Sequence, residues 1–158
     1  MELPPTLVEA LRRRGLDVGY VVDILAKSLG VDPPSLARAH AELAVRAFRE
    51  GLALAERGDV VQASEKLYKA VEEAVKALAI AGDLDEAREA LARGRWTVSL
   101  LDKAARRLGD KAWRAWTEAY FLHVNGFHEV RIDVSDVKAR LPIIQELVVE
   151  IEKILKEG

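Results

Sequence analysis

The chain contains no cysteine and only one methionine among its 158 residues. It also has a single asparagine and two glutamines. The lack of cysteine excludes disulfides, thiolate catalysis and cysteine-ligated zinc sites. Few thermolabile residues, together with many Lys, Arg and Glu residues, are typical of proteins from hot-growing organisms. We therefore expect a thermophilic protein.

The chain also has little excess charge and no long apolar run. Its 24 basic and 26 acidic residues leave a formal net charge of -2, so there is no overall field to hold a nucleic-acid backbone or an anionic membrane. No apolar run approaches the roughly 18 residues that suggest a membrane span. The N-terminal stretch MELPPTLVEALRRRG has its charges after its apolar part, unlike a secretory signal. We expect a cytoplasmic protein with neither a membrane nor a DNA partner.

Apolar residues recur at helical spacing through most of the chain, and Gly and Asp residues separate the segments. Period-two alternation is confined to Val130, Ile132 and Val134, a stretch too short to build a sheet. The pattern predicts an all-α fold. The expected helices span residues 6–14, 18–29, 33–57, 60–81, 85–93, 96–108, 110–125 and 136–155, with Pro142 either kinking the last one or starting it afresh.

The first two helices are short and are expected to form a unit of their own. Thr6 and Glu9 make a capping-box pattern, and Gly15 is a helix stop. In the next helix the apolar residues are Val18, Val21, Val22, Leu25 and Leu29. We predict that residues 1–31 form an N-terminal helical hairpin packed on a bundle domain of residues 32–158.

The segment 59–81 is predicted to be the central helix of that bundle. Its large apolar residues and its alanines lie on adjacent faces and cover an arc of roughly 200°, wider than the roughly 100° of a surface helix. The remaining third carries Glu65, Lys66, Lys69, Glu72, Glu73 and Lys76. This charged face could hold an anion, but its Glu65/Lys69 and Glu72/Lys76 spacings favour a solvated surface with ordinary i,i+4 pairs.

Several sequence blocks occur together in a specific order. They are H-x-E-L-A-x-x-x-x-x-E-G at 40–51, GDVVQASEKLYKAVEEAVKALA at 58–79, GRW at 94–96 and AYFLHVNGFHE at 119–129. In these blocks the chain resembles the archaeal PaREP family of small helical proteins, itself placed with the broader HEPN group. The resemblance implies an up-and-down bundle of about four to five main helices, often paired into dimers. It implies no established activity, and a toxin–antitoxin role is suggested only by the wider group.

Many HEPN proteins are ribonucleases with an R-x4-6-H signature, and this signature is not found here. Arg114 precedes His123 by nine positions, and no other arginine precedes a histidine at the required spacing. On a helix that separation is about 14 Å of rise, with the two side chains on opposite sides. A degenerate or noncanonical ribonuclease is therefore the least favoured hypothesis, and the missing signature argues against an enzyme.

The stretch FLHVNGFHEVRID is the part of the chain that looks most like a reactive site. It places His123, His128 and Glu129 within seven positions. Asn125 and Gly126 form a helix C-cap signal, with Gly126 able to adopt the left-handed conformation. A break there would separate the histidines, unlike the single continuous helix of a zinc-binding H-E-x-x-H motif. We therefore predict no metal or cofactor and favour a helix terminus over a functional pocket.

The other candidates each have a structural explanation beside a functional one. His40 lies on the apolar face of its helix, where a core histidine bonded to a carbonyl or carboxylate is favoured over a ligand. Arg95 and Trp96 begin a helix after Gly94, and Arg95 could reach an acidic neighbour or an anion. The stripe of Trp113, Trp116, Tyr120 and Val124 is interpreted as core or dimer interface before base stacking.

Three hypotheses follow. The favoured one is a homodimeric interaction or binding module without its own catalysis. The second is binding of a nucleotide or RNA through local basic residues such as Lys66, Lys69 and Arg95. The third is a metal-dependent or RNase-like enzyme that uses His123, His128 and Glu129. Together the candidate ligand-binding residues are His40, Lys66, Lys69, Arg95, Trp96, His123, His128 and Glu129.

Overall fold

The computed structural model describes residues 1–157, and over these residues it confirms the all-α prediction. No helix in this range is both long enough and apolar enough to cross a membrane. The elements are α1 (Pro5–Arg13), α2 (Val18–Leu29), α3 (Pro33–Glu56), α4 (Val60–Ala81), α5 (Asp85–Arg93), α6 (Val98–Leu108), α7 (Asp110–Leu122), the π-helical segment η1 (His123–His128) and α8 (Val134–Glu157).

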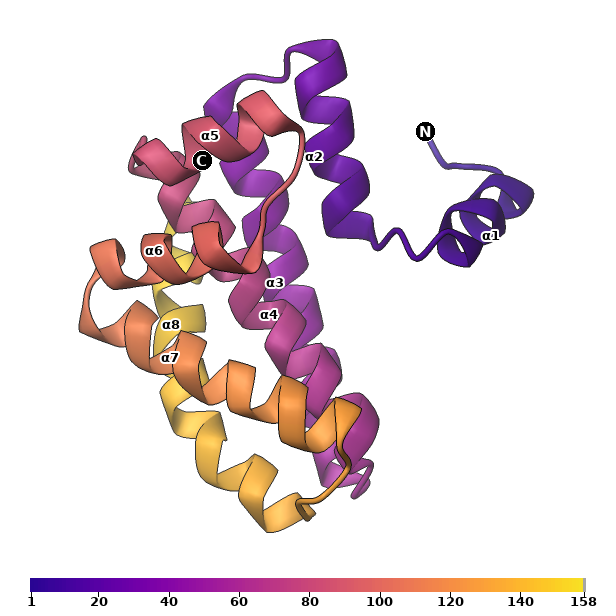
Figure 1. Ribbon diagram of the computed structural model, residues 1–158, viewed down its shortest axis with the longest axis vertical. Coiled ribbons are helices and arrows are strands. Elements are labelled where there is room, and N and C mark those ends of the chain that lie inside the picture. Colours follow the sequence, from indigo (N-terminus) through magenta and orange to yellow (C-terminus); the bar gives the residue numbers. More distant parts are fainter. Residues whose placement is uncertain (158) are drawn as a thin grey trace.

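The bundle is organised around α4. This helix contacts α3, α5, α6, α7, η1 and α8, as the wide apolar arc predicts. Figure 1 shows α3 and α4 running side by side along the long axis, with α7 and α8 packed beside them. The close approach of α3 and α4 depends on Gly51, because a Cβ there would lie 2.8 Å from a methyl carbon of Leu67. The centre of the core consists of fully buried side chains, including Leu67, Val71, Val75, Ile144, Leu147 and Ile151.

Local capping signals set most helix boundaries. Asp32 and Asp59 accept hydrogen bonds from the backbone N–H groups of Ser35 and Gln62, as predicted. Two predicted starts need correction. Thr6 is not a cap, because α1 begins at Pro5 without a side-chain cap. Trp96 lies outside the helix that it was expected to start.

The C-terminal helix α8 is continuous through Pro142. It begins at Val134, slightly before the predicted start. The Asp133 carboxylate accepts hydrogen bonds from the N–H groups of Ser135 and Asp136, and the Asp136 carboxylate accepts one from the Asp133 N–H. This reciprocal arrangement explains why the helix starts where it does.

The two N-terminal helices differ in how they pack. α2 lies against α3 and α5. α1 has no buried residue and projects away from the bundle (Figure 1). Only the second helix of the expected hairpin therefore packs on the main body.

The orientation of α2 is unusual. Its buried residues are Gly19, Asp23 and Ala26, whereas the larger Val18, Leu25 and Leu29 are exposed. The helix thus presents small and acidic residues to the bundle and large apolar residues to the outside.

Candidate functional site

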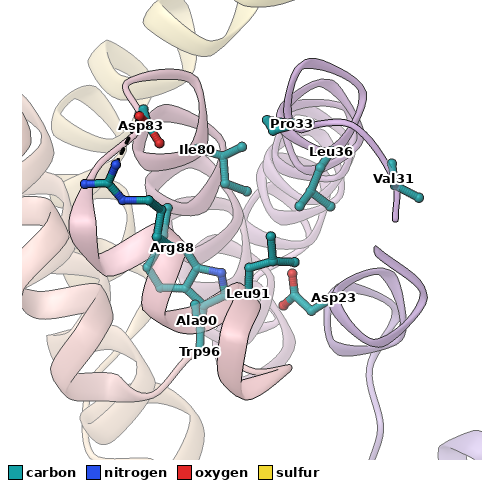
Figure 2. A pocket seen from close by; sticks show the side chains of 11 residues that line it. Asp23, Val31, Pro33, Leu36, Ile80, Asp83, Arg88, Ala90, Leu91 and Trp96 are labelled. Atoms are coloured by element: carbon teal, nitrogen blue, oxygen red, sulfur yellow. Dashed lines mark hydrogen bonds and ion pairs between the residues drawn. The ribbon is translucent and has the colours of Figure 1, made fainter. Parts of the chain in front are cut away.

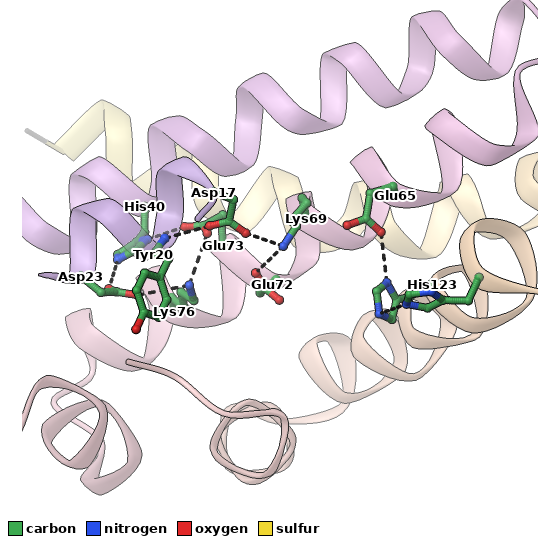
Figure 3. A network of polar contacts seen from close by, with 11 residues as sticks. Asp17, Tyr20, Asp23, His40, Glu65, Lys69, Glu72, Glu73, Lys76 and His123 are labelled. Atoms are coloured by element: carbon green, nitrogen blue, oxygen red, sulfur yellow. Dashed lines mark hydrogen bonds and ion pairs between the residues drawn. The ribbon is translucent and has the colours of Figure 1, made fainter. Parts of the chain in front are cut away.

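The charged face of α4 carries two polar clusters (Figure 3). The prediction of a solvated face is wrong for its C-terminal half, where Glu73 and Lys76 are each only 4% exposed. The reason is that α2 lies over this part of the face and inserts the Asp23 carboxylate. The first cluster, which we call the His40 cluster, consists of Asp23, His40, Glu73 and Lys76.

In the His40 cluster, one fully buried imidazole lies between two carboxylates. His40 Nε2 is 2.8 Å from Asp23 Oδ1, and His40 Nδ1 bonds to Glu73 Oε2. Lys76 Nζ lies 3.3 Å from Asp23 Oδ2 and 3.4 Å from Glu73 Oε1. The prediction of a core histidine bonded to a carboxylate is therefore confirmed, with two carboxylates where one was expected. The cluster joins α2, α3 and α4.

The two carboxylates favour the charged form of His40. Burial alone would lower the pKa of His40, but the hydrogen bonds to Asp23 and Glu73 outweigh burial and hold the pKa above its usual value. As an imidazolium, His40 donates through both ring nitrogens, which satisfies one oxygen of each carboxylate. Lys76 is held charged in the same way, because Glu73 and Asp23 raise its pKa against the effect of burial.

The raised pKa of His40 predicts a loss of stability at higher pH. Its stabilising contribution is fully present below the usual value of 6.5 and is lost as the pH rises through the raised pKa of the folded state. We expect the free energy of unfolding in urea to fall as the pH rises above 6.5 and through the raised pKa of His40. In the variant His40→Gln, whose side chain cannot be charged, the free energy of unfolding should fall less steeply with increasing pH. Equal slopes in the two proteins would contradict the assignment.

The predicted i,i+4 pairs along α4 are replaced by other partners. Lys69 Nζ lies 2.5 Å from Asp17 and 3.4 Å from Glu72, and Lys66 Nζ lies 2.8 Å from Glu50. Both lysines that the RNA hypothesis invoked are thus already paired with carboxylates.

The second cluster, which we call the His123 cluster, consists of Glu65, His123 and His128. His123 Nδ1 lies 3.0 Å from Glu65 Oε2, and His123 Nε2 lies 3.1 Å from His128 Nε2. The His123 and Glu65 side chains are about one-fifth exposed, and His128 is at the surface. The cluster is therefore partly open to solvent, unlike the His40 cluster.

The predicted helix break at Gly126 is wrong. The chain continues from α7 into η1 as one π-helical turn, and the residue with positive φ is Val130. Gly126 is buried because it packs closely on α4, where an added Cβ would lie 2.0 Å from Ser64 Oγ and 2.6 Å from Ser64 Cβ. Gly126 therefore permits a close approach between η1 and α4 and does not form a left-handed helix cap.

An aromatic column holds the His123 ring. Tyr68 stacks on it with ring centroids 4.0 Å apart and an interplanar angle of 21°, and Phe127 lies nearly parallel at 6.0 Å. The orientation of His123 is thus fixed by packing as well as by Glu65.

Trp116 is buried and its indole N–H donates to Asp102 at 3.1 Å. For Trp116, the structure agrees with the interpretation of the aromatic stripe as core.

A small pocket lies between α2, α3, α4 and α5 (Figure 2). Its volume of about 60 Å³ holds a few waters. Trp96 lines the pocket, and Asp23 connects it to the His40 cluster. Arg95 does not line it and is exposed. The wall is otherwise mainly apolar and includes Val31, Leu36, Ile80 and Leu91.

The structure brings together some of the predicted residues and separates others. His123 and His128 meet, whereas His40 belongs to the other cluster. Glu129 terminates η1, and its backbone N–H donates to Val124. The sequence reading missed Asp23, and it placed Glu73 and Lys76 in solvent. A signal for Asp23 was present, because it is the only charged residue in the apolar run VGYVVDILA.

The fold and these clusters define an all-α bundle protein with two carboxylate–histidine clusters on its central helix. The profile of the archaeal PaREP1/PaREP8 family matches residues 39–148. The chain belongs to this family, as its sequence blocks indicated.

Solved structures support the assignment. A crystal structure of a protein from Sulfolobus solfataricus is 34% identical, with 72% of this chain and 96% of that chain covered and a TM-score of 0.66. A solution structure of the same structural-genomics target is also 34% identical, with 72% and 92% covered and a TM-score of 0.64. Among curated proteins, no significant match is found.

Proposed function

We propose that the protein is an interaction module that works as a homodimer, and that two copies meet through α1 and the outer face of α2. We call this region the N-terminal surface. Its exposed apolar residues are Leu3, Leu7, Val8, Val18, Leu25 and Leu29.

The observation that carries the proposal is the orientation of α2. A packed helix ordinarily buries its large apolar residues, but here Leu25 is 46% exposed and Leu29 is 73% exposed. The ion pairs of Asp23 with His40 and Lys76 hold this orientation. Gly19 supports it, since a Cβ there would lie 1.9 Å from the Glu73 carboxylate. Apolar surface held outward in this way is typical of a binding face.

The helix α1 gives a second argument. It has nine residues and none of them is buried. An isolated helix shorter than about 12 residues is marginal in water, so α1 needs a surface to pack on. A groove between α1 and α2 is lined by Leu3, Val8, Leu11, Val18 and Val21. The region thus offers both a projecting amphipathic helix and an apolar groove.

A second copy is the occupant that we infer. Each chain carries both the projecting helix and the groove, so in a two-fold dimer the helix of each copy can pack into the groove of the other. The family match begins at residue 39, after α1 and α2. The residues of the proposed contact therefore lie outside the part of the chain that the family profile matches.

Leu25→Glu is expected to weaken the dimer. It places a charge in the centre of the apolar contact, and the dissociation constant should rise roughly tenfold or more, as measured by sedimentation velocity. The matched control is Val149→Glu on α8, because Val149 is also 46% exposed. A dimer that tolerates Leu25→Glu as well as Val149→Glu would overturn the placement of the contact.

Binding of a nucleotide or RNA stays a prediction. Lys66 and Lys69 are already paired with carboxylates. Of the three basic residues that the hypothesis named, it therefore depends mainly on Arg95. Fluorescence titrations with nucleotides and short RNA at increasing salt test it. Binding that weakens with salt and is reduced by Arg95→Gln would support it.

A further inference from the structure

The His123 cluster has the arrangement of a histidine prepared to bind a metal. Glu65 accepts a hydrogen bond from His123 Nδ1, which places the ring hydrogen on that nitrogen and leaves a lone pair on Nε2. In protein metal sites, a ligating histidine commonly donates its other N–H to a carboxylate in this manner, which fixes the ring and raises its basicity. Neither proposed function requires this arrangement.

The π-helical turn brings the second histidine to the same point. His123 and His128 are five residues apart, and on an α-helix their side chains would diverge by about 140°. The wider turn of η1 instead places their Nε2 atoms 3.1 Å apart. Insertions of a π turn are frequent at functional sites. Gly126, packed on Ser64, permits the wider turn to approach α4.

We propose that His123 and His128 bind one divalent transition-metal ion, such as Zn²⁺, Ni²⁺ or Co²⁺, through their two Nε2 atoms. Two nitrogens bound to a tetrahedral zinc at 2.0–2.1 Å lie roughly 3.3 Å apart, close to the separation in this structure. Imidazole nitrogen is a ligand that these ions prefer. Because His123 carries its ring hydrogen on Nδ1, the 3.1 Å contact in the metal-free chain is a hydrogen bond from the His128 Nε2–H to His123 Nε2. Binding of the ion therefore requires His128 to carry its hydrogen on Nδ1 instead, which its surface position allows.

The site supplies two protein ligands and leaves the other positions open. Within residues 1–157, no group of three or more His, Asp or Glu side chains converges on a metal position, so Glu129 is not a ligand here. Water or an external donor completes the coordination, as in sites that exchange ligands. We therefore expect weaker binding than at a structural zinc site.

The test is a titration of the full chain with Co²⁺ and Zn²⁺, followed by calorimetry and by NMR of the histidine rings. The chain has only three histidines, so each ring can be followed separately. Co²⁺ should broaden the signals of His123 and His128, while His40, buried in the other cluster, serves as the internal control. One ion should bind per chain.

Variants separate this site from general surface binding. His128→Ala is expected to lower the metal affinity at least tenfold without unfolding the chain, because His128 is exposed. Glu65→Gln should weaken binding roughly tenfold to a hundredfold and should not abolish it. Unchanged affinity in His128→Ala, broadening centred elsewhere, or no binding of either ion would overturn the proposal.

Discussion

Replacing His40 with alanine is expected to lower the free energy of unfolding by about 3–5 kcal/mol, because it leaves two buried carboxylates with Lys76 as their shared cation and without the imidazolium that binds one oxygen of each. The side chain is fully buried and contacts both Asp23 and Glu73. For a chain of this length, such a loss corresponds to a decrease in Tm of roughly 10 °C. Calorimetry of the variant measures it.

The loss of stability should appear first as local opening of α2, before the whole chain unfolds. Asp23 is the residue through which α2 enters the His40 cluster, so amide hydrogen exchange should accelerate first in α2. His128→Ala is the control, since it removes an exposed histidine. A His40 variant as stable as this control, or one with unchanged exchange in α2, would show that the cluster does not hold the helix.

Gly126→Ala is expected to destabilise the protein by about 1–3 kcal/mol through overpacking. The added Cβ would lie 2.0 Å from Ser64 Oγ, so η1 would have to move away from α4. This movement would also disturb the contact between Glu65 and His123. Thermal unfolding measures the cost.

A double-mutant cycle identifies the cause. Ser64→Gly removes both Ser64 atoms that the new methyl group would meet, so the double variant should be more stable than the sum of the single changes predicts. Ser64→Gly alone provides the reference. Additive losses would mean that the cost of Gly126→Ala comes from another neighbour, such as Ile132, rather than from this contact.

Features encoded by neighbouring residues were predictable from the sequence. Asp32 followed by Pro33, and Asp59 with Gln62, gave the starts of α3 and α4 because capping is local. The central position of α4 followed from the width of its apolar arc. His40 was recognised as a core residue because it lies among apolar positions of α3.

Features set by contacts distant in sequence were not predictable. The face that α2 buries depends on Asp23 meeting His40 and Lys76, which are 17 and 53 positions away. The sequence around Gly126 suits either a helix end or a close approach, and only the position of Ser64 decides between them. The meeting of His123 and His128 likewise depends on a π turn that helical periodicity does not predict.

The most direct test of the proposed function is the molar mass of the intact chain by light scattering over a wide range of protein concentrations. Two copies joined through the N-terminal surface give twice the mass of one chain, with dissociation only on dilution. A mass of one chain at every concentration would contradict the homodimer and leave the exposed Leu25 and Leu29 without the partner inferred here.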